Sequence, residues 1–298
     1  MATRTWIGGG NNEANNPNDW SPTGLPIPGE TLTATHGIIK IQGNELTGPG
    51  TLGSSVLQLQ GDVSVNLSKE ANVMPISVLQ GVADINIKDN AQFMLSTNGG
   101  SAVVDLANKS EWIGSFSAFT GSIVINGDHH AEFITNSSPS GATEVSNGAP
   151  AHVIINADIG QGSSEIDATA GATVEVGGSV ASGQIFQANA FSSEFGPALS
   201  TPGILKIDYP DLFAGIVNLG IGEIDLIGLR QADSYSYIND MLSFYSHGSI
   251  IDKLAVHQVP SISGSILGAL AVEKTSFGIA VYTSGEAHSA GTLLPLHA

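Results

Sequence analysis

The sequence predicts an all-β protein, a parallel β-helix (β-solenoid) with about 20 residues per coil, and three observations support this fold class. Short apolar segments alternate with polar residues along most of the chain. Gly, Asn, Asp and Ser bound these segments, which is typical of strands joined by turns. Charged residues make up only 12% of the chain, whereas Lys, Glu and Arg usually fill exposed helix faces. Helices are therefore not expected.

The predicted strands follow one another through the middle of the chain, and each alternates between inward apolar and outward polar positions. They are VLQLQ at Val56, VSVNL at Val63, ISVLQ at Ile76, ADINIK at Ala83, AQFML at Ala91, AVVDL at Ala102, SIVIN at Ser122, HVIIN at His152, ATVEV at Ala172 and QIF at Gln184.

The spacing of these strands favours a solenoid over other all-β folds. With one strand taken per group, the starts are about 20 residues apart, with one longer step. They lie at Ile38, Val56, Ile76, Ala102, Ser122, Thr143, Ser164 and Gln184. Stacked coils would bury columns of Val, Ile, Leu and Ala and leave outward positions to Asn, Ser, Gln and Asp. A sandwich or jelly roll is the alternative, but neither requires this regular spacing.

Residues 1–35 break the repeat and are predicted to form an N-terminal cap on a β-helix of residues 36–191. They are rich in Pro, Asn and Gly and carry Trp6 and Trp20. A solenoid needs its ends covered, because exposed strand edges promote aggregation. The two rings are expected to cover an apolar edge; an aromatic platform for sugar stacking is the alternative.

Residues 192–298 are predicted to form a C-terminal β-rich module with its own aromatic core. The run SYINDMLSFY is expected to form strands with a turn at Asn239-Asp240. The later segments DKLAVHQV and GSILGALAVEK are expected to be strands or one short helix. The aromatic residues of this module are Tyr209, Phe213, Tyr235, Tyr237, Phe244 and Tyr245.

The charge of the chain limits its partners. Asp and Glu number 27 and Lys and Arg number 9, giving a formal net charge of -18. Nucleic acids and anionic membrane surfaces are bound by clustered Lys and Arg, and no such cluster exists here. No apolar run approaches the roughly 18 residues of a membrane span. No nucleic-acid partner and no membrane insertion are expected.

Both ends of the chain resemble a known family. The segments TWIGGG and NPNDWSPTGLPIPGET are similar to the opening of bacterial autotransporter passengers and related secreted β-helix adhesins. DLFAG, GEIDLIGL and SYSYINDMLSF are similar to the closing module of such repeats, although Gly222-Glu223 stands where the family has Gly-Asp. The resemblance implies a solenoid body and a location outside the cell or on the bacterial cell surface, without implying an enzymatic activity.

The route of export stays open at this point. The chain lacks cysteine, which suits both a reducing cytosol and an exported chain. The N-terminus, MATRTWIGGGNN, lacks the apolar run that follows a basic start in a conventional signal peptide. The C-terminus, GTLLPLHA, leaves no room for the outer-membrane barrel of an autotransporter. We therefore expect an isolated passenger or a protein exported in one step.

No catalytic or cofactor-binding residue is predicted. Gly-x-Ser-x-Gly, phosphate-binding loops and calcium β-roll repeats are absent from the sequence. Asp128, His129 and His130 could offer metal ligands, but neighbours on a strand point to opposite faces, so a polar turn is the favoured interpretation. The metal ligands are unknown, no cofactor is predicted, and Ca²⁺ binding stays an open alternative.

A polysaccharide-active enzyme is the main catalytic alternative. Glycoside hydrolases need two carboxylates about 5–10 Å apart, which stacked coils could supply from residues such as Asp84, Asp105, Glu111 and Asp128. A polysaccharide lyase needs a basic group, and Lys69, Lys88 and Lys109 recur at near-coil spacing. These three lysines are expected to line one solvent-facing ridge instead.

These observations predict a structural or adhesive role in a biofilm matrix, surface layer or fibre. The expected partners are other copies of the chain, in a homo-oligomer or filament, or surface glycans. A glycoside hydrolase or lyase, or a carbohydrate-binding protein on the same scaffold, is the alternative. Ice binding is disfavoured, because the outward positions mix Gln, Asn, Asp and Lys without a Thr-x-Thr ladder.

Overall fold

The computed structural model describes residues 3–9, 11–27, 30–42, 56–73, 75–107, 110–120, 122–127, 132–135, 143–145, 152–160, 165–169, 172–189, 203–220, 222–258, 269–284 and 290–292. Regular structure in these ranges is β-strand, apart from two short 3₁₀ helices, η1 (Pro17–Asp19) and η2 (Pro210–Leu212). Neither described helix has the length and apolar character needed to cross a bilayer. The predicted all-β class is confirmed.

The chain folds as two compact units. Unit 1 comprises residues 1–136 and 156–160, and unit 2 comprises residues 137–155 and 161–298. The three-part division into residues 1–35, 36–191 and 192–298 stays a prediction, and residue 191 lies outside the described residues.

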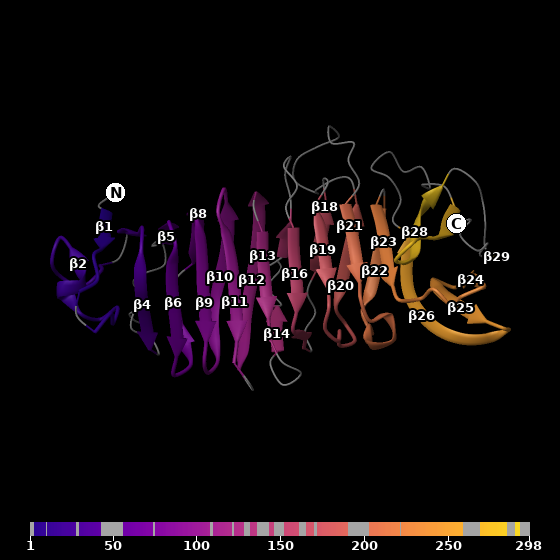
Figure 1. Cartoon of the computed structure of the whole chain (residues 1–298), viewed down its shortest axis with the longest axis horizontal. Coiled ribbons are helices and arrows are strands. Elements are labelled where there is room, and N and C mark those ends of the chain that lie inside the picture. The colour runs from indigo at the N-terminus through magenta and orange to yellow at the C-terminus, as the bar shows by residue number, and fades with distance from the viewer. Residues whose placement is uncertain are drawn as a thin grey trace. The chain divides into compact units, whose positions relative to one another are not determined.

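Unit 1 contains two sets of parallel strands (Figure 1). One set is ordered β4 (Gly37–Gln42), β6 (Val63–Ser68), β9 (Val82–Ile87), β11 (Ser101–Leu106) and β13 (Ser122–Asn126). The other is ordered β3 (Thr31–Ala34), β5 (Val56–Gln60), β8 (Ile76–Gln80), β10 (Ala91–Asn98), β12 (Glu111–Thr120), β14 (Glu132–Thr135) and β17 (Asp158–Ile159), with β7 (Ala71–Asn72) beside β10.

The core of unit 1 is built from apolar residues stacked in register on neighbouring strands. Val65, Ile85, Val104 and Ile125 lie opposite one another in β6, β9, β11 and β13, and all four are fully buried. Each such side chain stabilises the fold by about 1.5–3 kcal/mol by leaving water. The expected inward columns of apolar residues are thus present in this unit.

One corner of unit 1 is so tight that it requires glycine. Gly81 joins β8 to β9 with a φ of 77°, and a Cβ built there would lie 2.6 Å from the carbonyl carbon of Gly61. Gly61 occupies the corner between β5 and β6, where a Cβ would lie 2.0 Å from the backbone oxygen of Thr35. Successive corners therefore touch through their backbones, and any larger residue would force them apart.

An antiparallel pair terminates the N-terminal part of unit 1. β1 (Thr3–Trp6) lies parallel to β3 but antiparallel to β2 (Trp20–Ser21). Trp6 and Trp20 are opposite each other, 1% and 0% exposed, with ring centroids 5.0 Å apart in a T-shaped contact. The Trp20 Nε1–H donates to the backbone oxygen of Ala14 at 2.9 Å.

Unit 2 also contains parallel strands on two sides. One side carries β16 (His152–Asn156, whose last residue is counted with unit 1), β19 (Thr173–Val176), β21 (Gly203–Ile207) and β23 (Gly222–Ile227). The other carries β15 (Thr143–Val145), β18 (Glu165–Thr169), β20 (Ile185–Asn189), β22 (Ile216–Leu219) and the last part of β26 (Ser249–Gln258).

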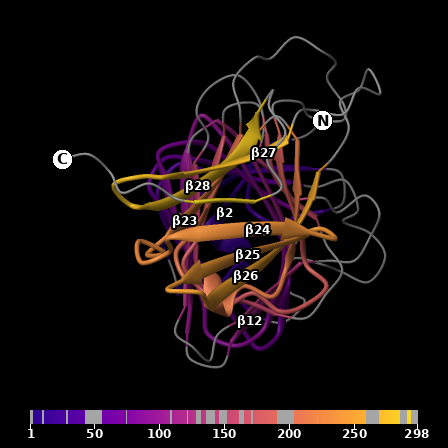
Figure 2. The same ribbon diagram turned by 90° about the vertical axis from the view of Figure 1, so that its right-hand side faces the viewer.

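The C-terminal strands of unit 2 reverse this polarity. β28 (Gly278–Ser284) pairs antiparallel with β23 and with β27 (Ala269–Lys274). β24 (Ser234–Ile238), β25 (Met241–Ser246) and the first part of β26 form an antiparallel group, seen in Figure 2, with β29 (Ala290–Thr292) beside β24. Asn239 and Asp240 make the β24–β25 turn, with φ of 50° and 60°, as the sequence predicts.

Several sequence expectations are refined by these pairings. The segments DKLAVHQ and ALAVEK lie in strands, so the alternative of a short helix does not hold for them. Parallel pairing continues beyond residue 192 through β21, β22 and β23 before the polarity reverses. The aromatic core expected near the C-terminus includes buried Phe213, Tyr235 and Phe244, whereas Tyr209 is 53% exposed.

Candidate functional site

A row of polar side chains follows the outward face of the first strand set of unit 1 and ends at the last residue of β16. It consists of Asn66, Asn86, Asp105, Asn126 and Asn156, and we call it the asparagine row. The first four lie opposite one another in β6, β9, β11 and β13. Asn126 Nδ2 donates to Asp105 Oδ1 at 2.9 Å, and Asn156 Nδ2 donates to Asn126 Oδ1 at 3.2 Å.

An amide side chain suits such a row because it carries both a donor and an acceptor. Identical amides on neighbouring strands, about 4.8 Å apart, can therefore bond to one another without repulsion. The remaining donors and acceptors face solvent at a regular spacing. This surface can form hydrogen bonds with a repeating polar ligand.

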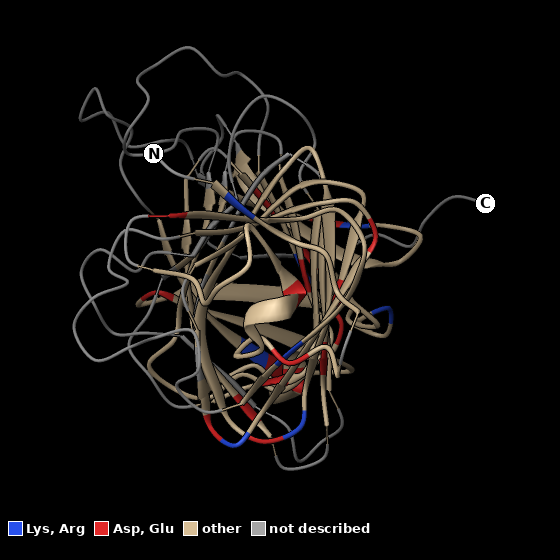
Figure 3. Ribbon diagram, turned by 90° about the vertical axis from the view of Figure 1, so that its left-hand side faces the viewer, with Lys and Arg blue, Asp and Glu red and all other residues tan. Residues whose placement is uncertain are grey.

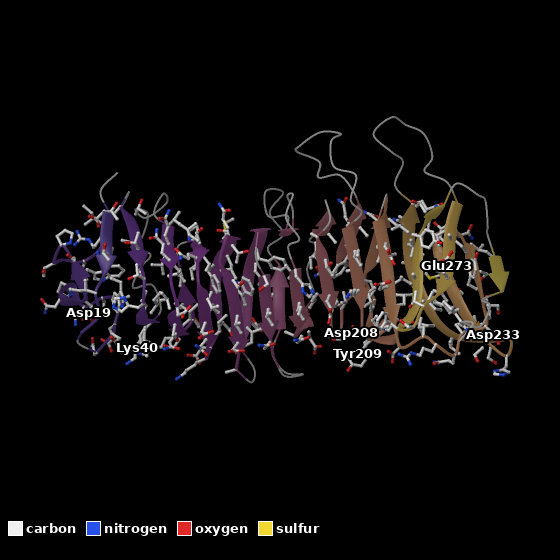
Figure 4. All side chains as sticks on the ribbon, turned by 45° about the horizontal axis from the view of Figure 1, so that its top comes forward. Asp19, Lys40, Asp208, Tyr209, Asp233 and Glu273 are labelled. Atoms are coloured by element: carbon white, nitrogen blue, oxygen red, sulfur yellow. The ribbon has the colours of Figure 1, made fainter. Side chains whose placement is uncertain are left out.

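The outward face of unit 2 has a different composition, which we call the acidic face. Its residues are Glu175, Lys206, Asp208, Glu223, Asp225 and Glu273. Glu175, Lys206 and Asp225 lie opposite one another in β19, β21 and β23, so that one cation separates two carboxylates. Figure 4 labels Asp208 and Glu273. Figure 3 colours the acidic residues of the described chain red and the basic residues blue.

The crowding of carboxylates on this face raises two pKa values. Partial burial, followed by the charge of Asp225, raises the pKa of Glu223 above its ordinary value, and Glu273 adds to the effect. Burial and the charge of Glu175 raise the pKa of Asp208, although Lys206 opposes them. Protonation of these groups is therefore favoured in the folded state.

Glu223 and Asp225 are two residues apart on β23, so their side chains lie on the same face of the strand. Tyr282 lies opposite Glu223, and its hydroxyl donates to Glu273. That hydrogen bond, together with burial, raises the pKa of Tyr282 to about 12. Tyr282 thus joins the carboxylates of β23 and β27 on the acidic face.

The N-terminal region carries a buried ion pair that sequence reasoning missed. Arg4 and Glu30 are 7% and 6% exposed, and two hydrogen bonds of 2.7 and 2.9 Å join them. Arg4 also donates to the backbone oxygens of Pro22 and Gly24. The Arg4 hydrogen bonds hold the pKa of Glu30 below its ordinary value. Because 26 residues separate the two side chains, no local pattern marks them as partners.

The two N-terminal tryptophans do not form a sugar-stacking platform. Trp6 and Trp20 are buried against each other, so neither ring presents a face to solvent. Their position beside the antiparallel end of unit 1 agrees with a covering role for the rings. The aromatic platform is therefore not supported in this region.

The described carboxylates considered for hydrolysis do not lie directly opposite one another. Asp84 and Asp105 are exposed on neighbouring strands, but they lie opposite Val103 and Asn86 respectively. Glu111 belongs to β12, in the other strand set. Asp128, His129 and His130 lie outside the described residues. In the part of the chain that is described, no group of three or more His, Asp or Glu is arranged to hold a metal ion.

Two of the three lysines of the expected ridge can be placed. Lys69 and Lys88 are exposed. The Lys69 N–H donates to Asp89 Oδ2 at 2.7 Å, and the Lys88 N–H donates to the Leu67 oxygen at 3.0 Å. The two lysines follow the neighbouring strands β6 and β9 and are offset from each other by one residue. Lys109 lies outside the described residues.

The sequence does contain the signal for the asparagine row. The segments VSVN, DIN, VVD, VIN and VIIN each place Asn or Asp directly after a buried apolar residue. Aligning the strands on that residue would have revealed the row. The acidic face carries no comparable repeated pattern.

No protein-family model, curated protein or solved structure matches this chain.

Proposed function

We propose that this chain is a structural or adhesive protein of a bacterial surface or extracellular matrix, built as a β-solenoid with about 20 residues per coil. Strand registers support the coil length: Val63 lies opposite Ala83, and Ala83 opposite Ala102. The resemblance of both chain ends to secreted β-helix adhesins supports the location. The proposed partners are surface glycans or further copies of the chain.

The asparagine row is the observation that carries this proposal. It offers a line of amide donors and acceptors at strand spacing, which suits the hydroxyl groups of an extended polysaccharide. Both units also end in antiparallel pairs, β1–β2 in unit 1 and β23–β28 in unit 2. Neither pair continues the parallel stacking, so binding along the strand faces is favoured over binding at the ends.

The test is glycan binding by the intact chain. A panel of neutral and acidic polysaccharides would be compared for the native chain and for a variant with Asn66, Asn86 and Asn126 replaced by alanine. Loss of three hydrogen bonds should weaken binding by about tenfold or more. Alanine at Ser77 and Ser96, which are outward residues of β8 and β10, is the matched control.

Two results would contradict the proposal. One is the absence of both polysaccharide binding and self-association in sedimentation experiments. The other is release of reducing ends or unsaturated uronates from the panel, which would favour the polysaccharide-active alternative. Equal binding by the asparagine-row variant and the native chain would exclude this row as the binding surface.

A further inference from the structure

The strands β27 and β28 cover the edge of β23 in unit 2. β23 lies parallel to β21 on one side and antiparallel to β28 on the other. Val281 and Ile279 of β28 lie opposite Ile224 and Leu226 of β23, and all four are buried. This pair of strands therefore protects an apolar edge from solvent, and its removal would expose β23.

We call β27 and β28 the β23 cap, and its contact with β23 is close. A Cβ at Gly278 would lie 1.9 Å from the backbone oxygen of Leu226, so only glycine allows β28 to approach this closely. The Gly228 N–H donates to the Phe277 oxygen at 3.1 Å, and the Thr283 hydroxyl donates to the Gly220 oxygen at 3.1 Å. The cap is held by short-range contacts that small displacements would break.

The outward side of the same interface gathers like charges. Glu223 and Asp225 project from β23, and β27 contributes Glu273. From β28, Tyr282 lies opposite Glu223, and Ala280 lies opposite Asp225. From β21, Ile204 lies opposite Glu223, and Lys206 lies opposite Asp225. Among the described residues, this interface thus combines three carboxylates with one cation and one tyrosine hydroxyl.

Attachment of the cap increases the repulsion within this group. Tyr282 lies opposite Glu223 and its hydroxyl donates to Glu273, so Glu273 joins this group only when β27 and β28 are paired with β23. The charge of Glu273 disfavours the charged form of Glu223 in the capped state, and this repulsion is relieved when the cap leaves. Lys206 also lies opposite Glu175, so its positive charge offsets only part of the negative charge of Glu223, Asp225 and Glu273.

We propose that β27 and β28 form a pH-responsive cap on β23, which loosens when Glu223, Asp225 and Glu273 are all charged and tightens when this group takes up a proton. The raised pKa of Glu223 agrees with this direction. Lys274 follows Glu273 on β27 and lies opposite Ile279, so its side chain points to the other face of the strand. This regulation concerns the unit 2 edge alone and holds whether or not the asparagine row binds glycans.

Hydrogen exchange of the intact chain at about pH 5 and about pH 7.5 tests the cap. Protection of β27 and β28, corrected for intrinsic exchange and compared with β19, should fall about threefold or more at the higher pH. Glu223→Gln should abolish that fall, whereas Asp211→Asn, an exposed change in η2 outside this group, should retain it. Gly278→Ala should lower protection at both pH values and serves as the reference for an open cap.

Equal protection of the native cap at both pH values would overturn the proposal. A fall that persists in the Glu223→Gln variant would also overturn it. If that variant fails to fold by circular dichroism, Glu273→Gln removes the charge contributed by the cap itself and is expected to reduce the fall in the same way.

Discussion

The asparagine row of unit 1 and the acidic face of unit 2 both stack polar side chains on parallel strands, but with different side-chain chemistry. In both, outward side chains of parallel strands lie directly opposite one another. Amides bond to their neighbours, as Asn126 does to Asp105. Carboxylates repel theirs unless a cation or a proton intervenes. The comparison shows that a stacked fold tolerates repeated polar residues freely, but repeated charges only with compensation.

The largest loss of stability is expected from breaking the buried ion pair of unit 1. Glu30→Gln leaves the charge of buried Arg4 without its partner and should destabilise unit 1 by about 3–5 kcal/mol. Hydrogen exchange of β1 and β3 would measure the loss. Glu70→Gln, an exposed change in the same unit, should have almost no effect. An equal response of the two variants would show that the buried pair contributes nothing.

The second prediction concerns a substitution that places stacked carboxylates in the asparagine row, as on the acidic face of unit 2. Asn126→Asp removes the hydrogen bond to Asp105 and places a like charge beside it. Unit 1 should lose about 1–2 kcal/mol near pH 7 at low salt, and high salt should recover part of the loss by screening the two charges. Denaturant unfolding at low and high salt would test this. Unchanged stability near pH 7 would mean that stacked carboxylates do not explain the difference between the units.

A third prediction concerns the only cation of the acidic face. Lys206→Met leaves Glu175 and Asp225 without the charge between them, and unit 2 should lose about 1 kcal/mol near pH 7. High salt should reduce the loss. Lys88→Met in unit 1, an exposed residue, is the control. Local stability by hydrogen exchange would distinguish the two, and equal effects would contradict the predicted role of Lys206.

The smallest expected effect is the opposite response of the two units of the native chain to acid. The pKa values of Glu223 and Asp208 are raised in the folded state, so their charged forms destabilise unit 2 at neutral pH. This destabilisation decreases as the pH falls through the pKa values of the two groups in the folded state. The pKa of Glu30 is lowered, so its stabilisation of unit 1 is complete above about pH 4.5 and is lost as pH falls further.

Moderate acid should therefore stabilise unit 2 while leaving unit 1 unchanged, and stronger acid should weaken unit 1. The lowered pKa of Asp233 acts in unit 2 only below its ordinary value of 3.8, outside the first window. Exchange protection measured at intervals from about pH 7 to about pH 4 would separate these responses. A parallel change in both units would contradict the assignment of the two kinds of carboxylate.

The sequence predicts the strands well because alternation is a local property. VLQLQ, ISVLQ and SIVIN lie in β5, β8 and β13 as expected, and the Asn239-Asp240 turn joins β24 to β25. Alternation does not say which strands are neighbours. Ile38 and Val56, treated as successive members of one series, belong to different strand sets.

The features that depend on distant neighbours could not be predicted. FGIAVYTSG alternates equally well in either direction, so nothing in it indicates that β28 would reverse the polarity of β23. Arg4 and Glu30 meet only because β1 and β3 are adjacent. The Glu223–Glu273 approach requires two further strands to return to the same sheet. Electrostatics that join distant segments become visible only with the tertiary structure.

The glycine corner of unit 1 also determines where this chain can tolerate insertions. Short connections at residues 35–36, 61–62, 81 and 99–100 join the two strand sets on the side where Gly61 and Gly81 touch. The return connection at residues 88–90 lies at the opposite ends of the strands, between β9 and β10. Evolution could therefore add residues at this return connection without disturbing the core register. A foreign peptide displayed within residues 88–90 would leave the strands in place, whereas the same peptide at Gly81 would separate them.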